Sequence, residues 1–110
     1  MDHDGIVVVF ITAGTGEQAR TIGQALLERR AAACVNIAPS ITSIFWWQEV
    51  LETDQEHLLI VKTRTSKMED VVRLVQETHT YEVPEVIALP VIGGNQEYLE
   101  WIGEEVKTPS

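Results

Sequence analysis

Cysteine, basic residues and long apolar runs are all scarce in this sequence of 110 residues. The single cysteine, Cys34, excludes a disulfide within the chain and favours a reducing compartment. Only 8 Lys and Arg oppose 17 Asp and Glu, which gives a net charge of −9 and argues against nucleic acid or an anionic membrane as a partner. No apolar run approaches the roughly 20 residues of a membrane span, and no secretory signal pattern is visible. We therefore expect a cytoplasmic protein.

The composition that remains is that of an ordinary globular domain. Hydrophobic residues make up 45% and charged residues 23% of the chain. A chain of this length can bury about two thirds of its unfolded surface, so it supports one core. We expect a single domain over residues 1–110, with a tail that frays from about residue 107.

Four strands are predicted from β-branched and apolar runs. They cover about residues 6–12, 33–37, 57–63 and 85–92, and residues 42–51 continue the second strand in extended form. Pro39 is expected to stop the second strand. The polar stretch ETDQE is expected to form the turn before the third strand.

Three helices are predicted from capping residues followed by apolar residues at helical spacing. Thr15 with Gln18 forms a capping box before a helix that reaches about residue 30. Ser66 with Glu69 forms a second capping box before a helix that ends near residue 78. Asn95 is expected to cap a final helix that continues to about residue 106.

The resulting order of elements is β-α-β-β-α-β followed by a terminal helix, which predicts an α+β protein with the ferredoxin-like, split-βαβ fold. Both main helices should cover one face of an antiparallel sheet. The other face of such a sheet normally alternates polar and apolar residues, but IVVVFI, IFWW, LLIV and VIAL are apolar on both sides. We therefore expect a second copy of the chain to cover that face; the alternative is that a tryptophan lies under a loop of its own chain.

The stretch GTGEQA, residues 14–19, matches the glycine spacing of a dinucleotide-binding turn. That site also needs an acidic residue about 20 positions later, and no Asp or Glu occurs between residues 31 and 48. A tight turn and helix N-cap is the better interpretation, although an anion at this helix N-terminus stays open.

Two groups of polar residues are candidates for a site. Cys34 is either a buried, inert thiol or a ligand for copper or zinc together with His79. In THTYEVPE, His79 and Glu85 flank a rigid proline on a short loop, where they could exchange protons or simply hold the loop in place. The acidic residues of 49–56 suit a solvated hairpin end or, less well, a weak divalent-cation surface.

The motifs AACVNI, SIFWWQ, LLIVKT, HTYEVPEVIALPV and EYLEWI together resemble the CutA family of divalent-cation tolerance proteins, over about residues 7–102. The resemblance implies a ferredoxin-like protomer, a homotrimer and a link to copper or another divalent metal ion. It implies that Cys34 is a copper ligand, and His79 matches the histidine of the family's H-x-Y-x-x-P-E motif; we take Cys34 and His79 together as the candidate metal ligands. It also implies a cleft between subunits that is lined by Glu56, Lys62, Tyr81, Glu85, Tyr98 and Trp101. Glu49 stands where relatives usually have glycine, so the hairpin turn should be built differently here.

From these residues and the resemblance we expect a trimeric binding or regulatory protein in metal tolerance, with a metal ion or small ligand in the clefts between subunits. The alternative is a signalling trimer that senses a nucleotide or small metabolite in the same clefts. An enzyme that uses His79 and Glu85 as an acid–base pair ranks last, because no nucleophile or cofactor motif accompanies them.

Overall fold

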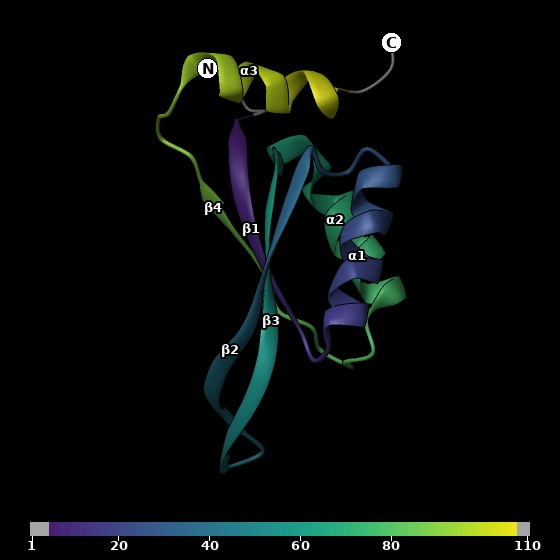
Figure 1. Ribbon diagram of the computed structural model, residues 1–110, viewed down its shortest axis with the longest axis vertical. Helices are drawn as coiled ribbons and strands as arrows, with labels where there is room; N and C mark the ends of the chain where they lie inside the picture. Colours follow the sequence, from purple (N-terminus) through teal and green to yellow (C-terminus); the bar gives the residue numbers. More distant parts are fainter. Residues whose placement is uncertain (1–4, 108–110) are drawn as a thin grey trace.

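The computed structural model describes residues 5–107, which form four strands and three α-helices in the predicted order (Figure 1). The strands are β1 (Ile6–Ala13), β2 (Cys34–Trp47), β3 (Val50–Arg64) and β4 (Val86–Pro90). The helices are α1 (Gly16–Glu28), α2 (Met68–Thr78) and α3 (Gln96–Glu105), and a short 3-10 turn (Thr65–Lys67) precedes α2. The β-α-β-β-α-β order with a terminal helix is therefore confirmed.

The four strands form one antiparallel sheet with the order β2-β3-β1-β4, and α1 and α2 lie together on one face of it (Figure 1). This is the ferredoxin-like arrangement that the element order predicts. Strand β1 is separated from β2 by β3, so the turn at Gly14 does not belong to a parallel βαβ nucleotide-binding unit.

The hydrophobic core lies between the sheet and these two helices. Alternate residues of β1 and β3 point toward the helices, and Val9, Ile11, Leu59 and Val61 have no exposed surface. They pack against apolar residues of α1 and α2 in a single cluster. Burial of each such side chain stabilises the fold by about 1.5–3 kcal/mol, so the helix-covered face holds the main hydrophobic core of residues 5–107.

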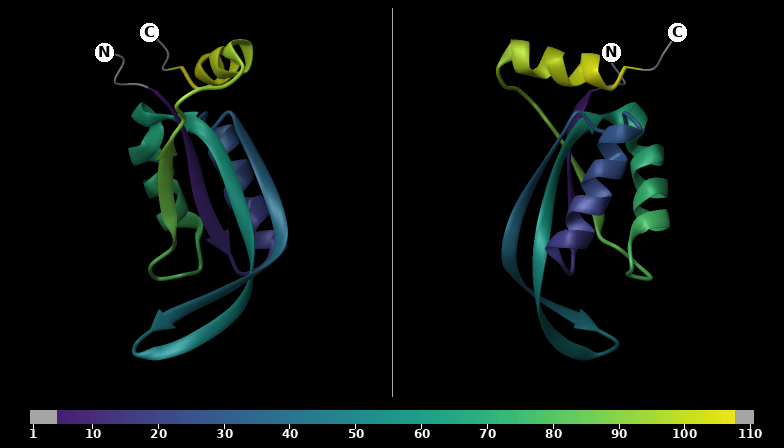
Figure 2. Two further views of the ribbon diagram at one scale, coloured as in Figure 1. Left: turned by 90° about the vertical axis from the view of Figure 1, so that its left-hand side faces the viewer. Right: turned by 45° about the vertical axis from the view of Figure 1, so that its right-hand side comes forward.

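The opposite face of the sheet, here called the open face, is also apolar. The strand register places Phe10 beside both Ile60 and Ile87, and places Val8 beside Leu89. Ile87 is 53% exposed and Leu89 46% exposed in the single chain. No helix of residues 5–107 lies over the middle of this face (Figure 2), so the open face has no cover from its own chain.

The two predicted capping boxes have different outcomes. Thr15 caps α1 and accepts a hydrogen bond from the backbone N–H of Gln18, as predicted. The Gln18 side chain does not return to Thr15 but donates to the carbonyl of Thr78, which ties α1 to the end of α2. The Ser66–Glu69 prediction was wrong in position, because Lys67 is the residue before α2 and the 3-10 turn occupies the expected cap.

Strand β2 does not stop at Pro39 as predicted. It continues to Trp47 through an irregularity between Ala38 and Ile41, where Ser40 has a φ of 58°. The two residues Pro39 and Ser40 face only His57 on β3, which is a β-bulge. Strand β2 is an edge strand, so a proline there removes no necessary hydrogen bond from the sheet.

The turn between β2 and β3 lies at Gln48 and Glu49 rather than in ETDQE. Trp47 pairs with Val50, and the two residues between them have φ values of 48° and 67°. Positive φ at both positions defines a type I′ turn, which usually contains asparagine and glycine. The prediction that residues 52–56 form a turn was wrong, because they lie within β3.

Residues 41–56 form a two-stranded hairpin arm that extends beyond the end of β1 (Figures 1 and 2). The pairing of β1 with β3 ends at Ala13 and His57, so the arm has no third strand. Its large apolar side chains are exposed: Ile44, Trp46, Trp47, Val50 and Leu51. Trp46 is 72% exposed, whereas Phe45 is half-buried, so the chain itself covers the IFWW run only in part.

Helix α3 lies across the end of the sheet that is opposite the arm (Figure 2). Its Ile102 and the following Val106 are buried. Arg30 forms a 2.7 Å ion pair with Glu105 and Arg64 donates to the carbonyl of Gly103, so both arginines hold the helix at this end. The predicted frayed tail falls almost wholly on residues 108–110, which lie outside the described residues.

Candidate functional site

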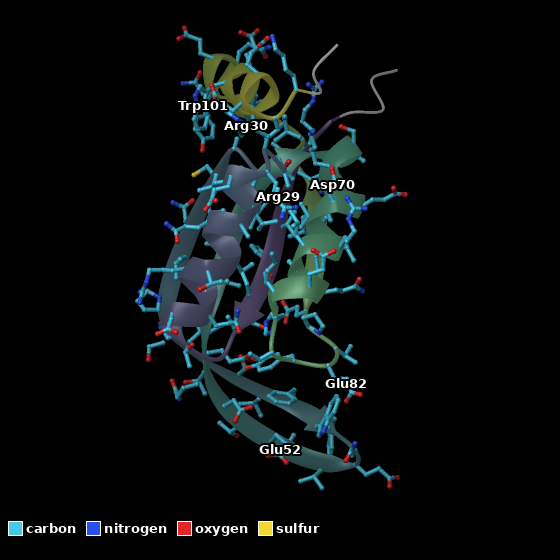
Figure 3. All side chains as sticks on the ribbon, turned by 90° about the vertical axis from the view of Figure 1, so that its right-hand side faces the viewer. Arg29, Arg30, Glu52, Asp70, Glu82 and Trp101 are labelled. Carbon is cyan, nitrogen blue, oxygen red and sulfur yellow. The ribbon has the colours of Figure 1, made fainter. Side chains whose placement is uncertain are left out.

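The predicted site residues form two groups at opposite ends of the sheet. Glu56, Tyr81 and Glu85 lie at the base of the hairpin arm, whereas Cys34 and Lys62 pair at the other end, near α3. Figure 3 shows the same separation, with Trp101 on α3 at one end and Glu52 and Glu82 at the other. The chain therefore brings some of the predicted residues together and keeps others apart.

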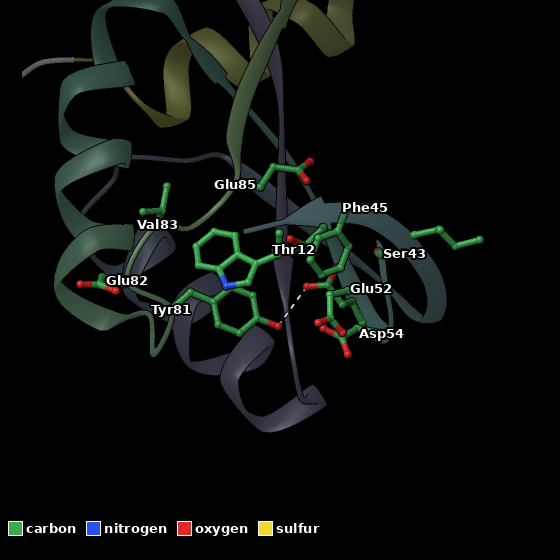
Figure 4. Close-up of a pocket in the computed structure, with 12 residues that line it drawn as sticks. Thr12, Ser43, Phe45, Glu52, Asp54, Tyr81, Glu82, Val83 and Glu85 are labelled. Carbon is green, nitrogen blue, oxygen red and sulfur yellow. Dashed lines mark hydrogen bonds between the residues drawn. The ribbon is translucent and has the colours of Figure 1, made fainter. Parts of the chain in front are cut away.

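The first group lines a cavity of about 690 Å³, here called the arm pocket, between the arm, the end of β1 and the loop of residues 79–85 (Figure 4). Tyr81 points across the pocket toward Phe45, Glu52 and Asp54 on the arm. The lining residues are Thr12, Ser43, Ile44, Phe45, Trp47, Glu52, Asp54, Glu56, Tyr81, Glu82, Val83 and Glu85. The pocket thus combines five carboxylates with three aromatic rings.

Two residues of the arm pocket lining are joined by a hydrogen bond: the Tyr81 hydroxyl donates to Oε2 of Glu56 at 3.0 Å. Glu56 is only 6% exposed, so this donor compensates part of the cost of burying the carboxylate. Burial and the hydrogen bond to Glu56 raise the pKa of Tyr81 to about 12, so the phenol stays protonated. A Cβ atom on Gly14 would lie 3.0 Å from the Tyr81 oxygen, which explains a glycine at this turn.

Glu85 lies at the edge of the same pocket. Burial, and then the nearby charge of Glu56, raise the pKa of Glu85 above its ordinary value. Two carboxylates that share one region repel each other when both are ionised. A cation that enters the arm pocket would relieve this repulsion.

His79 holds the loop of the arm pocket in place. Its Nδ1 accepts a 3.0 Å hydrogen bond from the backbone N–H of Tyr81, so the proton is on Nε2, which donates to the carbonyl of Thr12 at 2.7 Å. The His79 and Tyr81 rings are also in contact, with centroids 4.4 Å apart. Both ring nitrogens are therefore engaged, which supports the loop-holding interpretation over acid–base exchange with Glu85.

The second group, here called the Cys34 cluster, consists of Cys34, Asn36, Lys62, Tyr98 and Trp101. Lys62 donates to the Asn36 side-chain oxygen, and the half-buried Cys34 thiol lies 3.8 Å from the same oxygen. Burial and the adjacent Cys34 raise the pKa of Tyr98, whose ring stacks on Trp101 at 5.6 Å. Cys34 thus has polar neighbours on an edge strand, unlike an inert core thiol.

Cys34 and His79 do not meet within one chain. Cys34 pairs with Lys62 on β3, whereas His79 contacts Thr12, which pairs with Leu58. Four residues of an extended strand separate these two levels of the sheet by about 13 Å. Residues 5–107 contain no group of three or more His, Cys, Asp or Glu side chains arranged to hold a metal ion.

Several residues of the arm pocket were not predicted from the sequence. Phe45 and Trp47 looked like apolar strand residues, and Thr12 looked like the end of a buried strand. Glu52 and Asp54 were assigned to a solvated hairpin end or, less well, to a weak divalent-cation surface. The run IFWW was the one sequence signal for a pocket here. Its bulky side chains point to both faces of the strand, so each face needs something to pack against it.

The described residues define a small α+β protein of the ferredoxin-like class with a pocket beneath a hairpin arm. The family model described as CutA1 divalent ion tolerance protein matches residues 7–105. The chain therefore belongs to the CutA1 family, and the resemblance noted in the sequence is confirmed.

Relatives and solved structures agree with this assignment. The chain is 52% identical over 97 residues to the divalent-cation tolerance protein CutA of Thermus thermophilus, covering 88% of this chain and 94% of that protein. A solved structure of the divalent cation tolerance protein from Thermus thermophilus is similar with a TM-score of 0.89 and 50% identity, covering 91% of this chain and 97% of that one. The CutA1 crystal structure from Oryza sativa has a TM-score of 0.91 and 39% identity, covering 98% of this chain and 100% of that one.

Some relatives are longer than this chain, and some are named for the chloroplast or the periplasm. The chain is 45% identical to the chloroplastic protein CutA 1 of Oryza sativa over 96 residues, which are 87% of this chain and 54% of that protein. The chain thus spans about half the length of that relative. A solved relative from Archaeoglobus fulgidus is described as periplasmic; it has a TM-score of 0.89 and 42% identity, covering 93% of this chain and 99% of that one. Among residues 5–107, no helix is both long and apolar enough to cross a membrane.

Proposed function

We propose that this chain is a homotrimeric, non-enzymatic binding protein of divalent metal tolerance, and that it holds a metal ion or small ligand in clefts between its subunits. The observation that carries the proposal is the uncovered apolar surface of the open face and the hairpin arm. Monomeric proteins rarely leave such patches in water. The family name, divalent ion tolerance protein, supports the metal part of the proposal. The cytoplasm is the compartment proposed from the composition.

The metal ligands proposed are Cys34 and His79, with copper as the preferred metal. The two side chains lie at opposite ends of one sheet, so a single ion needs them from two different subunits. His79 would also have to give up one of its two hydrogen bonds. Cys34 keeps a soft, partly exposed sulfur that suits copper, so it should contribute more to the affinity.

Calorimetric titration of the protein with Cu(I), Cu(II) and Zn(II) tests the metal assignment. The wild-type protein should bind copper more tightly than Cys34→Ser and than His79→Ala, with the larger loss for Cys34→Ser. Because His79→Ala also frees the loop, its melting temperature and mass must be measured beside its affinity. Equal affinity of the wild-type protein and the double variant would refute the metal site.

A second candidate is a signalling trimer that senses a nucleotide or small metabolite in the same clefts. The volume and aromatic lining of the arm pocket favour a molecule larger than a bare ion. The acidic side chains of the same lining would repel the phosphates of a nucleotide, so an uncharged or cationic metabolite fits this pocket better. A thermal-shift screen of nucleotides and carboxylates tests this, because a ligand that prefers the native state raises the melting temperature. No shift with any of them would remove this candidate.

A further inference from the structure

The arm pocket has a charge pattern that differs from that of the rest of the protein. Its lining includes Glu52, Asp54, Glu56, Glu82 and Glu85 but no lysine, arginine or histidine. A second cavity of about 510 Å³, between α1 and β2, has both Glu17 and Arg20 in its lining. Of these two cavities, the arm pocket is therefore the one that concentrates charge of one sign around an apolar interior.

Glu56 is an independent reason to expect a positively charged occupant. Its side chain is more than nine-tenths buried, and its one hydrogen bond in residues 5–107 comes from the neutral Tyr81 hydroxyl. No ion pair of Glu56 occurs within the same residues. Buried carboxylates are normally paired with a cation or coordinate one, so this charge lacks its usual counterpart.

The geometry of the pocket argues against a bare metal ion as that counterpart. A divalent ion needs several oxygen atoms converging at about 2.0–2.6 Å. No such group of acidic side chains is present among the described residues, because the carboxylates are spread around a cavity of about 690 Å³. Phosphates and carboxylates as ligands are disfavoured by repulsion from the same acidic side chains.

Aromatic rings complete the recognition pattern. Phe45, Trp47 and Tyr81 line the pocket beside the carboxylates. The face of an aromatic ring attracts a cation, most strongly for tryptophan, and the apolar surface suits the hydrocarbon part of an organic molecule. Carboxylates and rings together are typical of sites for amines, guanidinium groups and quaternary ammonium groups.

We propose that the arm pocket binds an organic cation: a primary amine, guanidinium or quaternary ammonium group carried on a small apolar body. The charged group lies between Glu56 and Glu85, and the apolar body lies against Phe45 and Trp47. This deepens the proposed function, since it names the ligand class of the part of the cleft that the arm pocket forms. It rests on the proposed trimer leaving the arm pocket open and keeping Lys62 of the predicted cleft away from Glu56 and Glu85. It is separate from the copper assignment, which uses Cys34 and His79.

Three probes of similar size and different charge test the proposal: benzylammonium, benzyl alcohol and benzoate. Each is titrated at pH 7 into the full-length protein, and binding is measured by calorimetry and tryptophan fluorescence. Benzylammonium should bind about tenfold more tightly than benzyl alcohol, and benzoate should bind most weakly. Added salt should weaken the binding of benzylammonium and leave the binding of benzyl alcohol unchanged. Equal affinities for benzylammonium and benzyl alcohol, or no binding of benzylammonium, would overturn the proposal.

Matched variants locate the binding. Trp47→Leu should lower the affinity for benzylammonium about fivefold. Trp46→Leu should leave this affinity unchanged, because Trp46 is outside the pocket lining. Glu85→Gln should also weaken it, whereas Glu28→Gln, an exposed residue of α1, should not. All four side chains are exposed in the single chain, so each variant should fold, and the melting temperature checks this. Trp46 lies on the apolar arm surface assigned to the subunit contact, so the mass of each variant must show that the trimer persists before affinities are compared. Equal losses in Trp46→Leu and Trp47→Leu would overturn the placement.

The same variants separate this proposal from the proposed function. The Cys34→Ser variant should lose copper binding and keep benzylammonium binding. The Trp47→Leu variant should keep copper binding and bind benzylammonium more weakly. Loss of copper binding alone leaves the organic-cation site standing. Absence of benzylammonium binding in a trimer that binds copper refutes only the organic-cation site.

Discussion

The two faces of the sheet carry similar side chains in different environments. Leu59 on the helix-covered face has no exposed surface, whereas Leu89 on the open face is 46% exposed. Both belong to apolar strands of the same antiparallel sheet. The difference teaches that an apolar strand indicates a covered face without saying what covers it: α1 and α2 cover one face, and the proposed trimer covers the other.

The hairpin arm extends this comparison beyond the sheet. Trp46 and Trp47 belong to an arm with no third strand, so neither face of the arm is fully covered by its own chain. Trp47, at 48% exposed, is partly shielded in the arm pocket, whereas Trp46 is 72% exposed. Trp47 is therefore partly covered by its own chain, whereas Trp46 is the tryptophan for which the proposed trimer would have to supply the cover.

The largest effect is expected from charging the open face. Replacing Ile87 and Leu89 together by aspartate would place two unpaired carboxylates in the proposed subunit contact, which costs several kcal/mol. We expect sedimentation to show single 12.3 kDa chains. Leu27→Asp on α1, also an exposed leucine, is the control and should stay trimeric. A trimer that survives the double change would contradict the assignment of this face.

A cavity in the core on the helix-covered face should lower the stability of each chain without dissociating the assembly. Leu59→Ala is expected to lower the free energy of unfolding by about 2–5 kcal/mol, because the core around Leu59 is closed. The mass of the assembly should not change. Denaturant unfolding measures the loss, and sedimentation of the same sample checks the mass. Dissociation by Leu59→Ala would show that the two faces are not independent.

Tyr81→Phe should lower the free energy of unfolding by about 1 kcal/mol, because it removes the hydrogen bond to the buried Glu56 carboxylate. Glu56 lies on the same side of β3 as Leu58 and Ile60, which is the side of the open face. Unlike the exposed residues of that face, Glu56 is buried by its own chain. Tyr98→Phe, at the other end of the sheet, is the comparison and should cost less. Equal losses, measured by denaturant unfolding, would contradict the special role of Tyr81.

Glu49→Gly should raise the free energy of unfolding by about 0.5 kcal/mol. Glu49 has a φ of 67°, a left-handed conformation that costs a non-glycine residue about 1–2 kcal/mol, offset in part by the greater freedom of glycine in the unfolded chain. Glu52→Gly, within β3, is the control and should lower stability. A loss of stability in Glu49→Gly would show that the turn is not of type I′.

The smallest effect is expected for Glu85→Gln and depends on pH. The pKa of Glu85 is raised in the folded chain, so the folded state holds its proton more tightly and stability falls as pH rises from the ordinary value of 4.5 through the raised one. Glu85→Gln removes this loss, so it should melt slightly higher than the wild type at pH 7. The difference should vanish below pH 4.5. A lower melting temperature at pH 7 would contradict the sign.

Much of the fold follows from local sequence patterns. The element order, the Thr15 cap and the core face could be predicted because each depends on residues close together in the chain. The strand through Pro39 and the turn at Gln48 and Glu49 could not, because they depend on β2 being an edge strand and on a turn built without its usual glycine.

The site was less accessible from the sequence. The resemblance grouped six residues in one cleft between subunits, and the arm pocket of the single chain contains only three of them, Glu56, Tyr81 and Glu85. Sequence alone did not add Phe45 and Trp47, because the pocket forms only where the arm approaches the loop of residues 79–85, and no local pattern encodes that approach. The sequence could not place Cys34 and His79 relative to each other, whereas the fold engages both His79 nitrogens and leaves the Cys34 sulfur partly exposed.

Sedimentation velocity of the wild-type protein at nanomolar concentration tests most directly whether other copies cover the open face. The account predicts one folded species of three times the 12.3 kDa chain mass. A well-folded single chain at that concentration, with native circular dichroism, would contradict it.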